Sequence, residues 1–258
     1  MIHWIESQST SVIAVIVFGL SYVFTALVFA VTAALARRPV GEQLKAVSPV
    51  TLTPLAVILG LLIAFLAARV WENTGHANEY IGQEASALSK VMLFADTLPQ
   101  DVRSKVRDAV AQHVDFVVNH DWPEMAVARA NPRAEPVGLT HALAALLSFA
   151  PTQSDQSLAR QRAVAAVEQA FEARRNRVRL SQVEIAPVQW GVVLILAALI
   201  LITIAMIHIG KPAAMATTLF IFATATAACL VLLMENDRPF AAGGITLTPA
   251  AFRDIVLK

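Results

Sequence analysis

The stretch Val50–Ala68 reads VTLTPLAVILGLLIAFLAA and carries no charged side chain. A helix needs about 20 apolar residues to cross the hydrocarbon core of a bilayer. Three other stretches also meet this requirement, namely Val12–Leu35, Trp190–Ile209 and Ala213–Met234. Membrane-spanning β-strands are shorter and alternate polar with apolar residues. The sequence therefore predicts four transmembrane helices.

The composition agrees with a membrane protein. Of the 258 residues 57% are hydrophobic and 15% are charged, and the mean hydropathy is +0.61. A soluble domain has about 25% charged residues. A net charge of +1 gives no basic field for a nucleic acid. The single cysteine, Cys229, excludes a disulfide framework. Membrane lipid is thus an expected partner, and nucleic acid is not.

Charged residues concentrate in the middle of the chain. The segment from residue 69 to 188 holds 13 of the 20 Lys and Arg and 14 of the 19 Asp and Glu. We therefore expect an all-α integral membrane protein with a soluble helical domain between the second and third spans. Four parts are predicted: an N-terminal helix pair (1–68), the soluble domain (69–188), a C-terminal helix pair (189–234) and a tail (235–258).

Helical periodicity organises the predicted soluble domain. No stop signal separates the second span from Ala95, so one long helix is expected to leave the bilayer. A second helix follows Pro99, with an apolar stripe that stops near Asn119–Pro123. Further helices are expected at Leu139–Phe149 and Gln156–Glu184. The stripe consists of Val102, Val106, Val110, Val114 and Val117.

No motif in the chain indicates an enzyme. Phosphate-binding, dinucleotide-binding, serine-hydrolase and zinc-protease signatures are absent from the sequence. His113 and His120 lie seven residues apart and suit either a metal pair or two solvated or interfacial side chains. Glu235 and Asp237 suit either a calcium site or a structural acidic site at the membrane edge. We therefore expect no catalytic residue and no cofactor, with calcium as the weaker alternative.

The second span carries a family resemblance. Pro54-Leu55, then Leu59-Gly60, then Arg69 and Trp71 resemble the pore-lining second helix of bestrophins, which are pentameric anion channels. Further pairs along the chain are similar to a bacterial bestrophin-like family of unknown function. They are Trp71-Glu72, Glu84-Ala85, Leu98-Pro99, Trp122-Pro123 and the late stretch Asp237–Phe240.

The resemblance implies a pore and its lining. The positions that match the narrow bestrophin neck are Thr53, Val57 and Leu61, whose spacing puts them on one helix face. A symmetric ring, expected to be a homopentamer, would stack them as collars and pass small anions such as chloride. The bestrophin calcium clasp has a run of acids after its Pro-Phe pair, whereas this chain has Ala241–Gly244. Calcium gating is therefore not expected.

Three charged residues are candidates to line the pore just beyond the neck: Arg69, Glu72 and Glu79. Arginine rings favour anions and glutamate rings favour cations. Arg69 lies nearest the membrane, which favours anions. The alternative is that Arg69 contacts Glu72 within one chain.

Charge placement also bears on orientation. More basic residues lie on the side of the soluble domain and the termini than in the loop with Arg37, Arg38 and Lys45. The positive-inside rule then predicts a multi-pass protein of the cell inner (plasma) membrane, with both termini and the middle domain cytoplasmic. A second functional hypothesis remains, in which a non-conducting scaffold or sensor binds a protein partner through its cytosolic helices.

Overall fold

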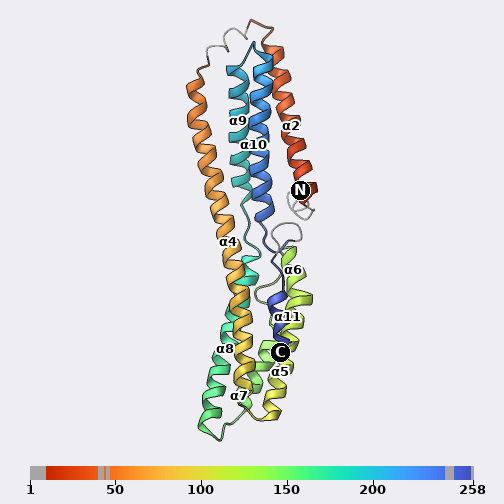
Figure 1. Cartoon of the computed structure of the whole chain (residues 1–258), viewed down its shortest axis with the longest axis vertical. Helices are drawn as coiled ribbons and strands as arrows, with labels where there is room; N and C mark the ends of the chain where they lie inside the picture. The colour runs from red at the N-terminus through yellow and green to blue at the C-terminus, as the bar shows by residue number, and fades with distance from the viewer. Residues whose placement is uncertain (1–9, 40–43, 45–46, 242–246, 257–258) are drawn as a thin grey trace. The chain divides into compact units, whose positions relative to one another are not determined.

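The structure is a computed structural model that describes residues 10–39, 44, 47–241 and 247–256 (Figure 1). Lys45, Gly243 and Gly244, which entered the predictions above, lie outside these residues. Four helical segments in the described part are long and apolar enough to cross a membrane. They are Thr10–Leu35, Pro49–Ala95, Pro187–Ile207 and Pro212–Asn236. The prediction of an all-α protein with four spans is confirmed.

The chain divides into two compact units. Unit 1 comprises residues 1–71 and 184–237, and unit 2 comprises residues 72–183 and 238–258. Helix α4 (Leu52–Ala95) contributes its first part to unit 1 and its remainder to unit 2. It runs unbroken through Gly75 and Gly82, as the sequence predicts, because an isolated glycine weakens a helix without ending it.

Unit 1 holds the apolar helices α2 (Thr10–Leu35), α9 (Pro187–Ile207) and α10 (Pro212–Asn236) with the first part of α4. Prolines occupy the first turns of α9 and α10, where the missing N–H has no helical partner to lose. Tyr22 of α2 stacks on Phe220 of α10 with ring centroids 5.3 Å apart. Its hydroxyl lies 3.0 Å from the Thr224 hydroxyl, which ties α2 to α10.

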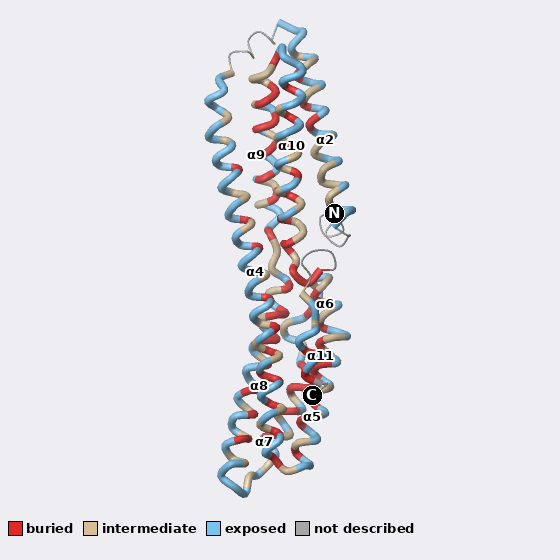
Figure 2. The backbone as a smooth tube through the Cα atoms, viewed as in Figure 1, coloured by how far each residue is buried: buried red, intermediate tan, exposed pale blue. Residues whose placement is uncertain are grey.

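Unit 2 contains α5 (Gln100–Phe116), α6 (Trp122–Ala126), α7 (Val137–Ser148), α8 (Ser154–Leu180) and α11 (Ala250–Val256). The five valines of the predicted stripe are all buried in its core. Figure 2 colours the backbone of these helices red at buried residues and pale blue at exposed ones. The valine stripe is thus confirmed as the core face.

The predicted stop near Asn119–Pro123 is wrong. A π-helical turn (η2) at Val117–Asp121 leads directly into α6, so the helical path continues to Ala126. Pro123 is accommodated because it falls in the first turn of α6. The helix predicted at Gln156–Glu184 begins earlier, at Ser154, and ends at Leu180.

The segment after α10 returns to the core of unit 2. The ring of Trp122 packs edge-on against Phe240 and Phe252, with centroids 5.6 and 6.2 Å away. Trp122 precedes α9, and both phenylalanines follow α10. Residues that precede α9 and residues that follow α10 therefore pack together in the core of unit 2.

Candidate functional site

The first part of α4 has one covered face and one uncovered face. Leu59, Leu66 and Val70 are buried in the core of unit 1. Thr53, Val57 and Leu61 are exposed, the last two by 53% and 54%. In the most apolar stretch of α4 11% of the residues are buried, compared with 39% in α9. Within a single chain, α4 thus leaves most of its apolar surface for lipid or for neighbouring copies.

Thr53, Val57 and Leu61 follow one another at intervals of four residues along the uncovered face. Successive members are about 6 Å apart along the helix axis. The structure therefore brings the three predicted neck residues onto one line. Whether this line borders a pore stays a prediction, because it depends on the neighbouring copies.

The second part of α4 carries polar side chains on its exposed surface. His76 Nε2 lies 3.7 Å from a Glu72 carboxylate oxygen, and its Nδ1 lies 3.5 Å from a Glu79 carboxylate oxygen. Gln83 Nε2 donates a hydrogen bond of 2.9 Å to Glu79. The carboxylates of Glu72 and Glu79 are therefore gathered around one histidine in the next turns of the helix.

The helical phase of these charges relative to the predicted neck differs. Glu79 follows Leu61 by 18 residues, which is five full turns of an ideal helix. Glu72 follows Leu61 by 11 residues and Arg69 follows it by 8, which places them about 20° and about 80° away around the axis. Of the predicted lining charges, Glu79 and Glu72 thus lie in phase with Leu61, and Arg69 lies to one side.

The two acidic residues at the end of α10 accept hydrogen bonds inside unit 1. Thr10 Oγ1 donates to Glu235 over 2.8 Å, and the backbone N–H of Ile185 donates to Asp237 over 2.9 Å. Asp237 is buried. These contacts fit the structural alternative for the pair. Among the described residues, no group of three or more His, Cys, Asp or Glu side chains is arranged to hold a metal ion.

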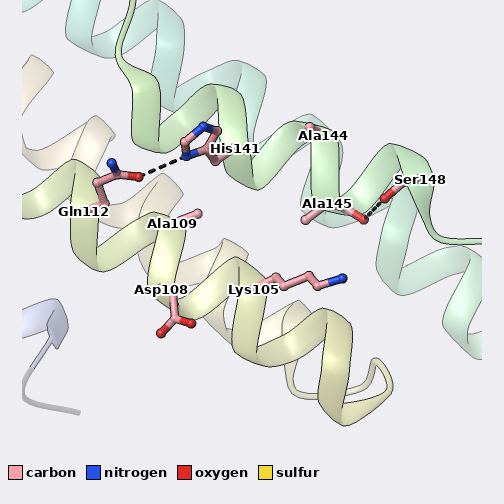
Figure 3. A pocket seen from close by; sticks show the side chains of 8 residues that line it. All are labelled: Lys105, Asp108, Ala109, Gln112, His141, Ala144, Ala145 and Ser148. Carbon is pink, nitrogen blue, oxygen red and sulfur yellow. Dashed lines mark hydrogen bonds between the residues drawn. The ribbon is translucent and has the colours of Figure 1, made fainter.

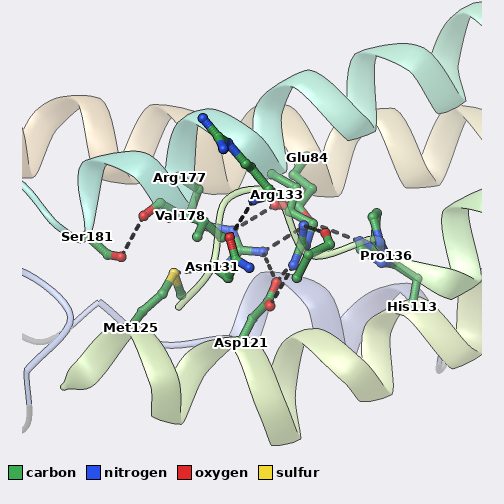
Figure 4. Close-up of polar contacts among 12 residues, drawn as sticks. Glu84, His113, Asp121, Met125, Asn131, Arg133, Pro136, Arg177, Val178 and Ser181 are labelled. Carbon is green, nitrogen blue, oxygen red and sulfur yellow. Dashed lines mark hydrogen bonds and ion pairs between the residues drawn. The ribbon is translucent and has the colours of Figure 1, made fainter. Parts of the chain in front are cut away.

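A buried ion cluster lies in the core of unit 2. It consists of Glu84 from α4, His113 from α5, Asp121 from the π turn, and Arg174 and Arg177 from α8. Figure 4 shows the side chains of Glu84, His113, Asp121 and Arg177 pointing toward one another. All five residues are at least 98% buried.

Glu84 is the acceptor at the centre of this ion cluster. Arg177 donates to it twice, from Nε over 2.7 Å and from Nη2 over 3.2 Å. His113 Nε2 lies 3.0 Å from the same carboxylate. Burial alone would raise the pKa of Glu84, but the charge of Arg177 and the contact with His113 outweigh burial and hold it at about 2. Glu84 is therefore ionised at neutral pH.

Asp121 and Arg174 complete the cluster. Arg174 donates to Asp121 through Nε and Nη2, both over 2.8 Å, and to the Ala134 carbonyl over 3.0 Å. Arg177 Nη2 also reaches Asp121 over 3.3 Å. Two carboxylates thus face two guanidinium groups, so the charges balance when His113 is neutral. Such balance is what allows charges to stay buried.

The family model for the bestrophin-like domain matches residues 19–252. The chain belongs to the bestrophin-like family. No curated protein matches.

Solved structures of a bacterial bestrophin homologue from Klebsiella pneumoniae share the fold of this bestrophin-like chain. A single-substitution variant of that homologue superposes with a TM-score of 0.72 at 12% identity, covering 95% of this chain and 96% of that one. The structure phased on zinc has a TM-score of 0.68 at 11% identity, covering 92% and 95%. The chain is therefore a membrane protein with the bestrophin fold.

The sequence reasoning missed the cluster of this bestrophin-like chain. In the sequence, Glu84 stands out only in the pair Glu84-Ala85 of the family resemblance. The prediction of a solvated or interfacial side chain is wrong for His113, which is fully buried against Glu84, whereas His120 is exposed. One signal was available: Glu84 is the only charged residue on the buried stripe Ala77, Ile81, Glu84, Leu88, Val91, Ala95.

Unit 2 also has an open surface hollow of about 630 Å³ between α5 and α7 (Figure 3). Ala109, Ala144 and Ala145 contribute small side chains to its lining. His141 Nδ1 lies 3.1 Å from Gln112 Oε1 and links the two helices at one edge. The hollow exists because the alanine side chains are too small to fill the space between α5 and α7. The polar side chains of the lining lie at its exposed rim.

Proposed function

We propose that this chain is an oligomeric ion channel in which α4 lines a central pore. Small anions such as chloride pass a neck formed by Thr53, Val57 and Leu61 of each copy, and the ring is a homopentamer. Membership in the bestrophin-like family supports a channel. The neck is supported by the uncovered line on α4, which lies opposite the face that packs in the core of unit 1.

The three neck positions offer a physical basis for gating. Rings of hydroxyl, isopropyl and isobutyl groups would succeed one another at about one helical turn along the axis. A narrow apolar ring expels water and stops ions until it widens. The neck would therefore control conduction through its diameter and its wetting, without a charged group at the constriction.

One observation favours cations as the alternative permeant ions. Glu79 lies in helical phase with Leu61, and Glu72 is its neighbour around His76. Repeated around a ring, these carboxylates would attract cations. Arg69 would favour anions if its long side chain reaches the axis from its position at the side. The sign of the selectivity is thus decided by whichever of these charges borders the pore.

We propose that unit 2 and both termini lie in the cytoplasm and that the spans lie in the inner membrane. The basic residues that flank the spans support this orientation under the positive-inside rule. The hairpin of α9 and α10 is consistent with it, since residues before and after the hairpin pack in one unit.

The test is chloride efflux from liposomes that contain the purified protein. We expect Val57→Ala and Leu61→Ala to raise efflux several-fold, because a smaller side chain widens an apolar ring. Val15→Ala on α2 and Leu232→Ala on α10 are matched controls, since both side chains are exposed apolar residues of unit 1. The controls should conduct like the parent.

The same assay separates the channel from the scaffold hypothesis. A stable oligomer without efflux of either chloride or sodium, even with both neck positions cut to alanine, would refute conduction. In that case the cytosolic helices of unit 2 become the candidate binding surface for a protein partner.

A further inference from the structure

The buried stripe of α4 in unit 2 does not by itself specify one rotation of the helix. Apart from Glu84 it is apolar, and several members are small, such as Ala77 and Ala95. Hydrophobic contact is non-directional. An apolar seam made of similar side chains can therefore be satisfied by a helix turned or shifted by one residue.

Glu84 differs from the rest of the stripe because its contacts have direction. Its two oxygens receive the Nε and Nη2 groups of Arg177 and the Nε2 atom of His113 at 2.7 to 3.2 Å. A shift of one residue turns α4 by about 100°. That turn would remove Glu84 and leave Arg177, which is fully buried, without its main counter-charge.

A π turn after α5 contributes to the geometry of the ion cluster. His113 and Asp121 are eight residues apart, so on a regular α-helix they would point about 80° apart. A π turn closes its hydrogen bonds over five residues, so each residue turns the chain less. The π turn at Val117–Asp121 therefore brings Asp121 round toward the same side as His113. The arginines then meet acids from two different helices.

We propose that Glu84 is a positioning residue that fixes the rotation of α4 about its axis, and thereby selects which face of α4 stays uncovered. A single buried polar group that sets the register of an otherwise apolar helix seam is a well-attested use of such groups. The inference rests on the proposed function only in that the uncovered face borders a pore. The rotation can be measured without any ion flux.

The experiment is cysteine labelling of the full-length protein in a Cys229→Ala background. Gly82→Cys reports the uncovered face, because nothing lies within 4 Å of a Cβ at this position. Leu88→Cys reports the buried face, since Leu88 is fully buried. In the parent a water-soluble maleimide should label the first cysteine and spare the second.

The decisive variant is Glu84→Met with Arg177→Met. It removes one charge of each sign, so the Asp121–Arg174 pair stays balanced. We expect labelling of Gly82→Cys to fall while labelling of Leu88→Cys rises, with a change in their ratio on the order of tenfold, because a turned helix exchanges its faces whereas local opening alone leaves Gly82→Cys accessible. The matched control is Asp96→Met with Arg107→Met, an exposed ion pair of 2.8 Å in the same unit. It should leave the labelling ratio unchanged.

A labelling ratio equal to that of the parent would overturn the proposal. Glu84→Gln is the second arm, because it keeps the side-chain shape and removes only the charge, and a smaller rise is expected there. If neither variant yields an oligomer of parental size, the proposal is also overturned, since the cluster would then maintain the whole fold. Absence of flux in every protein would refute the channel and leave the labelling result intact.

Discussion

Gly138 of α7 packs directly on the backbone of His113 in α5. A Cβ atom added to Gly138 would lie 2.6 Å from the His113 nitrogen and 2.6 Å from the Ala109 carbonyl oxygen. Neither backbone atom can move without shifting α5. Glycine therefore allows α7 to approach the helix that holds one member of the ion cluster.

We expect Gly138→Ala to lower the free energy of unfolding by roughly 1–3 kcal/mol, because it overpacks this contact. Gly82→Ala is the control. Its Cβ would meet nothing within 4 Å, so it should stabilise α4 by about 0.5–1 kcal/mol. Urea unfolding followed by circular dichroism measures both. Equal effects of the two substitutions would contradict the close approach of α7 and α5.

The second prediction concerns acid. Glu84 has a pKa of about 2 in the folded protein and an ordinary value of 4.5. A lowered folded pKa stabilises the protein above pH 4.5, and this contribution is lost as the pH falls toward 2. It amounts to roughly 3 kcal/mol. Unfolding measured from pH 7 to pH 2.5 should show a loss of stability that is smaller in Glu84→Gln. An identical pH profile in that variant would show that Glu84 is not the group responsible.

The third prediction concerns ion selectivity. Glu72→Gln with Glu79→Gln removes two carboxylates from the exposed side of α4, so the permeability ratio of chloride to sodium should rise several-fold. Reversal potentials in planar bilayers measure this ratio. Glu168→Gln with Glu172→Gln is the control, since both residues are exposed on α8. An unchanged permeability ratio in the Glu72→Gln, Glu79→Gln variant would show that these side chains lie away from the ion path.

The fourth prediction concerns calcium. Asp237 accepts a hydrogen bond from the buried backbone N–H of Ile185. We expect millimolar calcium, compared with a chelator, to leave both the melting temperature and the ion flux unchanged. Asp237→Ala should lower the free energy of unfolding by about 1–3 kcal/mol, because it removes the acceptor of that N–H. A calcium-dependent rise in melting temperature that disappears in Asp237→Ala would instead support a calcium site.

The spans could be predicted because bilayer thickness imposes a length and a composition on a contiguous stretch. Val50–Ala68 can be recognised as a span from its own length and composition, without information about the rest of the fold. The valine stripe of α5 could be predicted for a similar reason, since a buried helix face repeats locally. Both the spans and the valine stripe depend only on residues that are close together in the sequence.

The buried cluster could not be predicted, because its members meet only in three dimensions. Glu84 and Arg177 are 93 residues apart. The π turn is equally invisible, since Val117–Asp121 contains no residue that forbids an α-helix and its path depends on where Asp121 is held. The neck residues stay a prediction, because their role depends on contacts between copies of the chain.

The core of unit 2 is completed by residues that are synthesised after α9 and α10. Phe240 and Phe252 join a core that residues 72–183 begin, and both membrane helices of the α9–α10 hairpin are made in between. During translation Trp122 can pack against Phe240 and Phe252 only after the α9–α10 hairpin has been made. A chain that stalls within the last spans would keep an open apolar surface, which quality-control proteases and chaperones bind. The discontinuous unit 2 thus reaches its final packing only after both helices of the α9–α10 hairpin have been made.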